Sequence, residues 1–95
     1  MSTNFRVYVG TGGVADSTLK DIDTIAGEVC NGYTKYNANG GWLSMSNNLV
    51  VESCIVYEFI SAYLTRVHAF ANTAKTLTNQ DAILITKQEV EMFIV

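Results

Sequence analysis

The chain has 95 residues, of which 48% are hydrophobic and 16% charged, and its formal net charge is −3. This length predicts a single domain that spans residues 1–95. The six basic residues are scattered along an acidic chain, which argues against a nucleic-acid partner, and no apolar run approaches the length of a membrane span.

The composition also bears on cofactors, compartment and assembly. Cys30 and Cys54, with His68 as the single histidine, do not make a metal-binding set, so no metal or other cofactor is expected. The start Met1-Ser2-Thr3-Asn4 lacks the features of a secretion signal, and a cytoplasmic protein with free thiols is the simplest expectation. The charged fraction lies below the quarter that is typical of globular proteins, which favours burial of surface by self-association.

The first third of the chain predicts a strand and then a helix. Residues 5–9 alternate in character, which places Phe5, Val7 and Val9 on a core face and Arg6 and Tyr8 on the opposite face. After a glycine-rich turn at 10–13, Asp16 or Ser17 is expected to cap a helix. The buried stripe of that helix is predicted at Leu19, Ile22, Ala26 and Val29.

The middle of the chain predicts a short strand, a turn and a long strand. Residues 33–36 form the short strand, and the Asn39-Gly40 pair indicates a turn at 37–41. Residues 42–45 add a short strand or strand extension before the chain turns again into a long strand at 48–59.

The long strand has two different faces. Its odd positions are mostly apolar and are expected to pack on the helices: Leu49, Val51, Ser53, Ile55, Tyr57 and Phe59. Its even positions are half apolar and half acidic: Val50, Glu52, Cys54, Val56 and Glu58. A face that is open to solvent would be more polar, so we expect a second copy of the chain or a ligand to cover the even face.

The last third predicts a helix and two strands. The helix is expected to start at Ser61 or Thr65 and to end at residues 78–80. Its expected core face consists of Tyr63, Val67, Phe70, Ala74 and Leu77. A strand at 81–86, a turn at 87–88 and a final strand at 90–95 follow. The complete order predicts an α+β domain of the ferredoxin-like, split βαβ type, with two helices on one face of an antiparallel sheet and an extra C-terminal strand.

Two acidic residues of the long strand are candidates for a site. A carboxylate such as Glu52 among apolar neighbours needs a partner. This partner is either Arg6, as an ion pair across the sheet, or a cationic or hydroxyl-rich ligand at a subunit boundary. Glu58 lies nearer the strand end and is expected to be solvated.

Aromatic and amide side chains form a second group of candidates. Trp42, the only tryptophan, is expected either to stack on a nucleobase together with Tyr33 and Tyr36 or to cover the small core. Gln80, just before the predicted strand at 81–86, is expected either to read a base edge or to cap the preceding helix.

Three segments resemble a set of small phage and bacterial proteins: Tyr8-Val9-Gly10, residues 32–53 with Gly41-Trp42 and Glu52-Ser53, and Asn79-Gln80. The order also resembles the phage-encoded S-adenosylmethionine (SAM) lyases, formerly called hydrolases. That resemblance implies a ferredoxin-like oligomer, dimer or trimer, which binds its substrate between subunits. It matches Glu52 to the glutamate of that family, and it places Trp42 near a position where the family has tyrosine, with the spacing about one residue different.

The resemblance further implies a function. The carboxylate of the substrate attacks its own γ-carbon and expels methylthioadenosine, which leaves homoserine lactone. Glu52 would orient the cationic substrate, Trp42 or Tyr33 would pack the adenine, and Gln80 would hydrogen-bond it, while Arg6 and Tyr8 complete the candidate ligand-binding set. The alternatives are an oligomeric phage protein that sequesters a nucleotide-type signal in anti-defence, and an interaction module without a small ligand.

Overall fold

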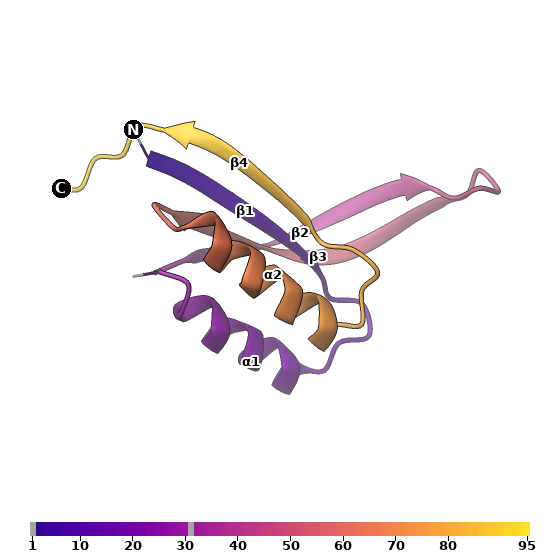
Figure 1. Cartoon of the computed structure of the whole chain (residues 1–95). Coiled ribbons are helices and arrows are strands. Elements are labelled where there is room, and N and C mark those ends of the chain that lie inside the picture. The colour runs from indigo at the N-terminus through magenta and orange to yellow at the C-terminus, as the bar shows by residue number, and fades with distance from the viewer. Residues whose placement is uncertain (1, 31) are drawn as a thin grey trace.

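The computed structural model describes residues 2–30 and 32–95, which form a four-stranded antiparallel sheet with two helices on one face (Figure 1). The elements in chain order are β1 (Ser2–Gly10), α1 (Asp16–Gly27), β2 (Thr34–Leu43), β3 (Leu49–Ile60), α2 (Leu64–Leu77) and β4 (Leu84–Val90). The strand order is β2-β3-β1-β4, and all three pairings are antiparallel. The predicted ferredoxin-like α+β topology is therefore confirmed.

The core lies between the two helices and the sheet face that they cover. The odd residues of β1 (Phe5, Val7 and Val9) and Ile22, Ala26 and Val29 are buried, as their spacing predicts. Three aromatic rings from β3 and α2 form the centre. Phe70 meets Tyr57 and Phe59 edge-on, with ring centroids 5.2 Å apart in both pairs. Such edge-to-face contacts add to the free energy that the burial of the rings supplies.

One polar contact ties α1 to the sheet beneath it. The hydroxyl of Tyr57, a fully buried residue, donates a 2.7 Å hydrogen bond to Asp23 Oδ1. Lys35 Nζ lies 2.6 Å from the other carboxylate oxygen. Partial burial acts to raise the pKa of Asp23, but Lys35 and Tyr57 outweigh it and leave this pKa below its ordinary value. Asp23 therefore connects α1 to β2 and β3.

Both helices begin differently from the prediction. Asp16 is the first residue of α1, and its N-cap Ala15 offers no side-chain hydrogen bond, so the predicted capping by Asp16 or Ser17 is wrong. The second helix begins at Leu64, after an N-cap at Tyr63. Val67, Phe70 and Ala74 are buried as predicted, but Tyr63 is 75% and Leu77 41% exposed because they stand at the two ends of α2.

The predicted turn at residues 37–41 is wrong, because β2 is continuous from Thr34 to Leu43. The Asn39-Gly40 pair lies inside the ladder, opposite Ser53 and Glu52. The second predicted turn, just before the long strand, is confirmed: the chain reverses between Ser44 and Asn48, where Asn47 has a left-handed backbone with φ of 62°. The tendency of Asn-Gly to turn is thus overridden by regular pairing with β3.

Residues 39–53 form a projecting hairpin that we call the arm. Beyond the Gly10–Cys54 pair, β1 no longer accompanies β3, so the outer parts of β2 and β3 pair only with each other. Figure 1 shows this hairpin extending past the helices. Leu49 and Val51 are 68% and 62% exposed, so their predicted place in the core is wrong: the alternation is correct, but no helix covers the arm.

The sheet ends at Val90, and the predicted extra strand at 90–95 is absent from the structure. Lys87 and Gln88, predicted as a turn, are strand residues that pair with Phe5 and Asn4 of β1. The pairing stops where Val90 meets Ser2, because Ser2 is the first residue of β1. Residues 91–95 continue without regular structure, and we call them the tail.

Candidate functional site

The sheet face without helices carries most of the predicted site residues. Residues that pair directly across antiparallel strands point to the same face. Arg6 pairs with Glu58, Tyr8 with Val56, and Gly40 with Glu52. Trp42 follows Gly40 by two residues on β2 and points the same way. The register therefore places Arg6, Tyr8, Glu52 and Trp42 on one face.

Gln80 joins this face from the loop between α2 and β4. Gly10 lies two residues after Tyr8 and pairs with Cys54. A Cβ added to Gly10 would lie 3.1–3.3 Å from the carboxamide atoms of Gln80, so this amide occupies the space that a side chain at position 10 would fill. The backbone N–H of Gln80 donates to the carbonyl of Lys75 at 3.1 Å, which ties the loop to the end of α2. Gln80 is thereby held over the base of the arm.

Glu52 and Trp42 lie farther out on the arm. Trp42 pairs with Val50, and Glu52 is its diagonal neighbour on β3. Diagonal neighbours of this kind have Cα atoms about 7–8 Å apart. Trp42 is 53% exposed, so the alternative that it covers the core is wrong. Glu52 is exposed, and its direct partner, Gly40, has no side chain. Both side chains are therefore accessible to a ligand.

The predicted ion pair between Glu52 and Arg6 is wrong, because the register gives Arg6 a different partner. Arg6 Nε lies 3.5 Å from Glu58 Oε2, and Asn4 Nδ2 donates to Glu58 Oε1 at 3.0 Å. Glu58 is thus a partly buried, bonded carboxylate rather than the solvated one that its place near the strand end suggests. Sequence reasoning could not find this cluster, because it depends on which residues of β1 and β3 are in register.

The charge state of Glu58 follows from its neighbours. Burial acts to raise its pKa, but hydrogen bonding by Asn4 and Tyr36 and the positive charge of Arg6 outweigh this and hold the pKa of Glu58 below its ordinary value. Desolvation, followed by the contact with Glu58, raises the pKa of the Tyr36 hydroxyl. Asn4 Oδ1 and Arg6 Nε are buried without a well-aligned hydrogen bond. This cluster therefore carries a stable negative charge next to a fixed guanidinium.

Tyr33 is the one predicted residue that the structure separates from the others. Its ring lies 5.7 Å from that of Tyr57 and 6.4 Å from that of Phe59, between centroids, on the helix-covered side of the sheet. Tyr33 and Trp42 therefore do not form one aromatic surface. Tyr36, by contrast, shares the helix-free face with Trp42 and is 42% exposed.

An open hollow of about 350 Å³ lies at the base of the arm. It is lined by Asn37, Ala38, Asn39, Ser53 and Cys54. The hydroxyl and the N–H of Thr11 both reach the carbonyl of Ser53, at 3.2 and 3.0 Å, and fix the neighbouring loop. The sequence shows the two asparagines, but their pattern predicts a turn rather than a hollow beside a strand. The amides and the serine hydroxyl offer neutral hydrogen-bonding groups that suit an uncharged polar ligand.

The described residues contain no group of three side chains that could hold a metal ion. Within the same part of the chain, neither helix has the length and apolar character needed to cross a membrane.

No family model and no curated protein matches the sequence, but solved structures share its fold. A phage SAM lyase in complex with S-methyl-5′-thioadenosine aligns with a TM-score of 0.69 and 17% identity over 93% of this chain and 81% of the lyase. The periplasmic divalent cation tolerance protein CutA from Archaeoglobus fulgidus aligns with a TM-score of 0.65 and 5% identity over 99% of this chain and 88% of CutA. The B. subtilis GlnK–ATP complex gives 0.62 and 11% identity over 92% and 81%. At these identities the likeness establishes the ferredoxin-like fold, and at that level it supports the resemblance to the phage SAM lyases.

Proposed function

We propose that the protein is a phage-type SAM lyase that acts in the cytoplasm as a homo-oligomer and binds its substrate on the helix-free face around the arm. The observation that carries this proposal is the position of Glu52, Trp42 and Gln80. The strand register places Glu52 of β3 and Trp42 of β2 on one face, and the carboxamide of Gln80, from the α2–β4 loop, lies beside Gly10 of the same face. The fold that carries these residues is similar to that of a phage SAM lyase that holds S-methyl-5′-thioadenosine.

The proposed reaction needs no cofactor and no water. A carboxylate oxygen of the substrate forms a bond to its own γ-carbon while the bond from that carbon to the sulfonium sulfur breaks. The electron pair of the broken bond stays on sulfur, so methylthioadenosine leaves as a neutral thioether and homoserine lactone remains. The protein has to hold the reactive conformer and keep water out, because both contribute to the rate without a protein nucleophile.

Each residue has a role that follows from its chemistry. Glu52, a carboxylate with no side chain across from it, attracts and orients the cationic substrate. Trp42 stacks on the adenine, and the carboxamide of Gln80 hydrogen-bonds the base or the sugar. Tyr8 and Arg6 extend the binding surface along β1, where the Arg6 side chain remains 35% exposed beside Glu58.

A second copy of the chain is part of the proposal. Glu52 and Trp42 are exposed in the single chain, whereas the reaction is favoured by a site that excludes water. A dimer or trimer in which another copy covers the helix-free face would supply this wall. Tyr33, on the opposite side of the sheet, would reach the adenine only if it came from that neighbouring copy.

The test is a direct assay. The protein is incubated with SAM, and methylthioadenosine and homoserine lactone are separated by chromatography. Equimolar formation of both is expected, with a loss of at least about tenfold in Glu52→Gln, which keeps the size of the side chain but removes its charge. Glu28→Gln, an equally conservative change at an exposed position at the end of α1, is the matched control and is expected to retain full turnover. Absence of both products, in a sample shown to be folded, would refute the proposed lyase activity.

A second candidate function is the sequestration of an adenine nucleotide signal in anti-defence. It is favoured by Trp42, because an indole can stack on adenine but lacks the phenol hydroxyl of a tyrosine. Thermal-shift measurements with linear and cyclic adenine nucleotides test it. Stabilisation without turnover that disappears in Trp42→Ala supports sequestration, and a shift unchanged in that variant excludes the aromatic contact. With neither turnover nor a thermal shift, the protein is an interaction module without a small ligand.

A further inference from the structure

The tail, residues 91–95, has the composition of a strand, but it pairs with no strand among the residues that the structure describes. Met92, Phe93, Ile94 and Val95 are 46%, 82%, 87% and 123% exposed, respectively. Aromatic and β-branched residues of this kind are typical of strands that are buried on both faces. Four consecutive exposed apolar residues are costly in water, so this segment has the properties of an unpaired strand.

The arm offers an unprotected edge to such a strand. β2 is an edge strand of the sheet, and its residues 36–43 contain no charged side chain. The other edge strand, β4, carries Lys87 and Glu89, and charges of this kind protect an edge against pairing with another chain. The two edges of the sheet therefore differ. Along residues 36–43, the edge of β2 has no charged side chain that would prevent another strand from pairing with it.

The outer part of the arm carries large exposed apolar side chains on both of its faces, with Glu52 as the charged residue on the helix-free side. Trp42 points to the helix-free side, while Leu43, Leu49 and Val51 point to the other, and all four are more than half exposed. In the tail, Met92 and Ile94 share one face and Phe93 and Val95 share the other. A tail strand beside β2 would therefore extend both apolar surfaces of the arm.

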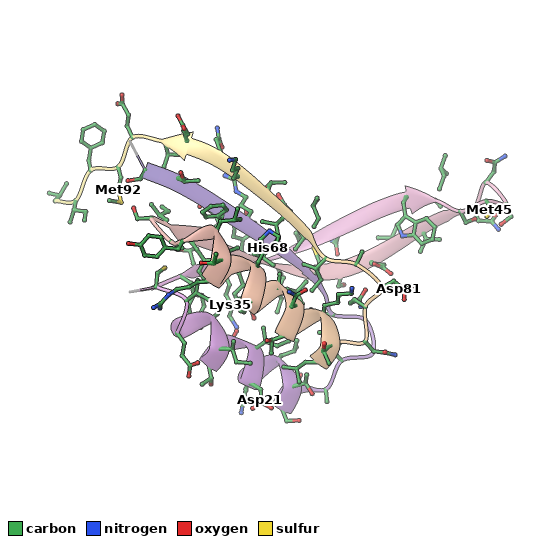
Figure 2. All side chains as sticks on the ribbon, in the orientation of Figure 1. Asp21, Lys35, Met45, His68, Asp81 and Met92 are labelled. Carbon is green, nitrogen blue, oxygen red and sulfur yellow. The ribbon has the colours of Figure 1, made fainter. Side chains whose placement is uncertain are left out.

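The tail cannot reach the arm of its own chain. Figure 2 shows Met92 and Met45, at the arm tip, at opposite ends of the molecule, whose longest extent is 47 Å. Five extended residues span at most about 17 Å. Any contact between the tail and the arm is consequently a contact between two copies of the chain.

We propose that the tail of one copy adds as a strand to the edge of β2 in the arm of a second copy. The exposed parts of Trp42 and Phe93 correspond to about 300 Å² of surface, given roughly 150–250 Å² for a buried aromatic residue. With the aliphatic residues of both segments, one contact buries several hundred Å², which is in the range of small, reversible interfaces. Backbone hydrogen bonds along β2 add to this burial, as in other cases of strand addition.

The contact joins two different surfaces, so it is heterologous. Each copy donates its tail at one end and accepts another tail at its arm, and a set of such contacts closes into a ring when the rotation between copies allows. This arrangement does not depend on lyase activity. With the proposed function it shares the expectation of self-association and the use of Trp42, which the tail would contact at its edge of β2. The mass measurements below and the turnover assay above can therefore fail independently.

Two complementary variants test the contact by size-exclusion chromatography with light scattering. The first, Phe93→Asp with Ile94→Asp, disables the tail and leaves the arm intact. The second, Leu43→Asp with Val51→Asp, disables the arm and leaves the tail intact. Each alone is expected to be monomeric, whereas the wild-type chain is oligomeric. An equimolar mixture is expected to form a species of twice the chain mass, because one intact tail then meets one intact arm.

The control is Leu64→Asp, a similar change at a half-exposed apolar residue in the first turn of α2, which is expected to keep the wild-type mass. Circular dichroism verifies that every variant is folded. A wild-type chain that is monomeric at micromolar concentration overturns the proposal, as does a tail variant of unchanged mass. A mixture in which both variants stay monomeric excludes the pairing of tail with arm, and a control that also dissociates shows that the effect is not specific to these surfaces.

Discussion

The inner and outer halves of β3 have the same alternation but opposite environments. Ile55, Tyr57 and Phe59 are at most 8% exposed under the two helices, whereas Leu49 and Val51, on the same face of the same strand, are more than 60% exposed. The difference lies in what covers the strand and not in the strand itself. The inner half is stabilised within the chain, and the outer half has apolar side chains whose burial requires something outside the chain.

The largest expected effect is a difference in how much a truncated side chain in each half lowers the free energy of unfolding. Phe70→Ala removes the ring that contacts both Tyr57 and Phe59 and is expected to lower the free energy of unfolding by about 3–5 kcal/mol. Leu49→Ala in the arm is expected to change it by less than about 0.5 kcal/mol, since no helix packs there. Urea denaturation measures both. The comparison should be made at concentrations where the mass is that of one chain, and similar losses at the two sites would contradict it.

A smaller loss of stability is expected from removing the one polar group that the buried Tyr57 places in the inner half. Tyr57→Phe removes the hydrogen bond to Asp23 but keeps the ring in the core. A loss of about 1–2 kcal/mol in the free energy of unfolding is expected, because the acceptor is charged while Lys35 remains beside it. Chemical denaturation of the purified variant provides the measurement. A variant that equals the wild type would show that Lys35 alone satisfies Asp23.

The smallest effect concerns the pH dependence that a carboxylate of the inner half, Glu58, gives to stability. The folded state lowers the pKa of Glu58, so its contribution to stability is fully present above its ordinary pKa of 4.5 and is lost as the pH falls through the lowered value. Glu58→Gln is therefore expected to weaken the decrease of the melting temperature with acid. Thermal unfolding between about pH 3 and pH 6 tests this, and parallel curves for the wild type and Glu58→Gln would contradict the assignment.

The sequence was sufficient for the order of the elements from β1 to β4, but not for the end of the sheet, and it was sufficient for the buried stripes. Phe5, Val7 and Val9 alternate with polar residues, and Ile22 and Ala26 recur at helical spacing, so local periodicity alone identifies their core faces. The extent of each strand was less accessible, because it depends on pairing with a distant segment. Asn39-Gly40 has the chemistry of a turn, but its pairing with β3 keeps it extended.

The candidate site was predictable as a face but not as a set of contacts. The parity of Arg6, Tyr8, Glu52 and Trp42 places them on one side of the sheet, and this follows from the sequence once the strands are known. Which carboxylate pairs with Arg6 depends on the register, and this selects Glu58 over Glu52. Tyr33 is adjacent to a strand of the same sheet, but it packs on the opposite face.

The arm is joined to the rest of the fold through the continuation of β2 and β3 and, at its base, through the hydrogen bonds of Thr11 to Ser53. This has a consequence for how such proteins diverge. Adding two residues to each strand near residues 39 and 53 would preserve the alternation of side chains and move the hairpin tip outward by about 7 Å. The packing of Phe70 and its neighbours would not change. Natural variation in hairpin length would thus adjust the spacing between neighbouring copies while the folded body stays the same.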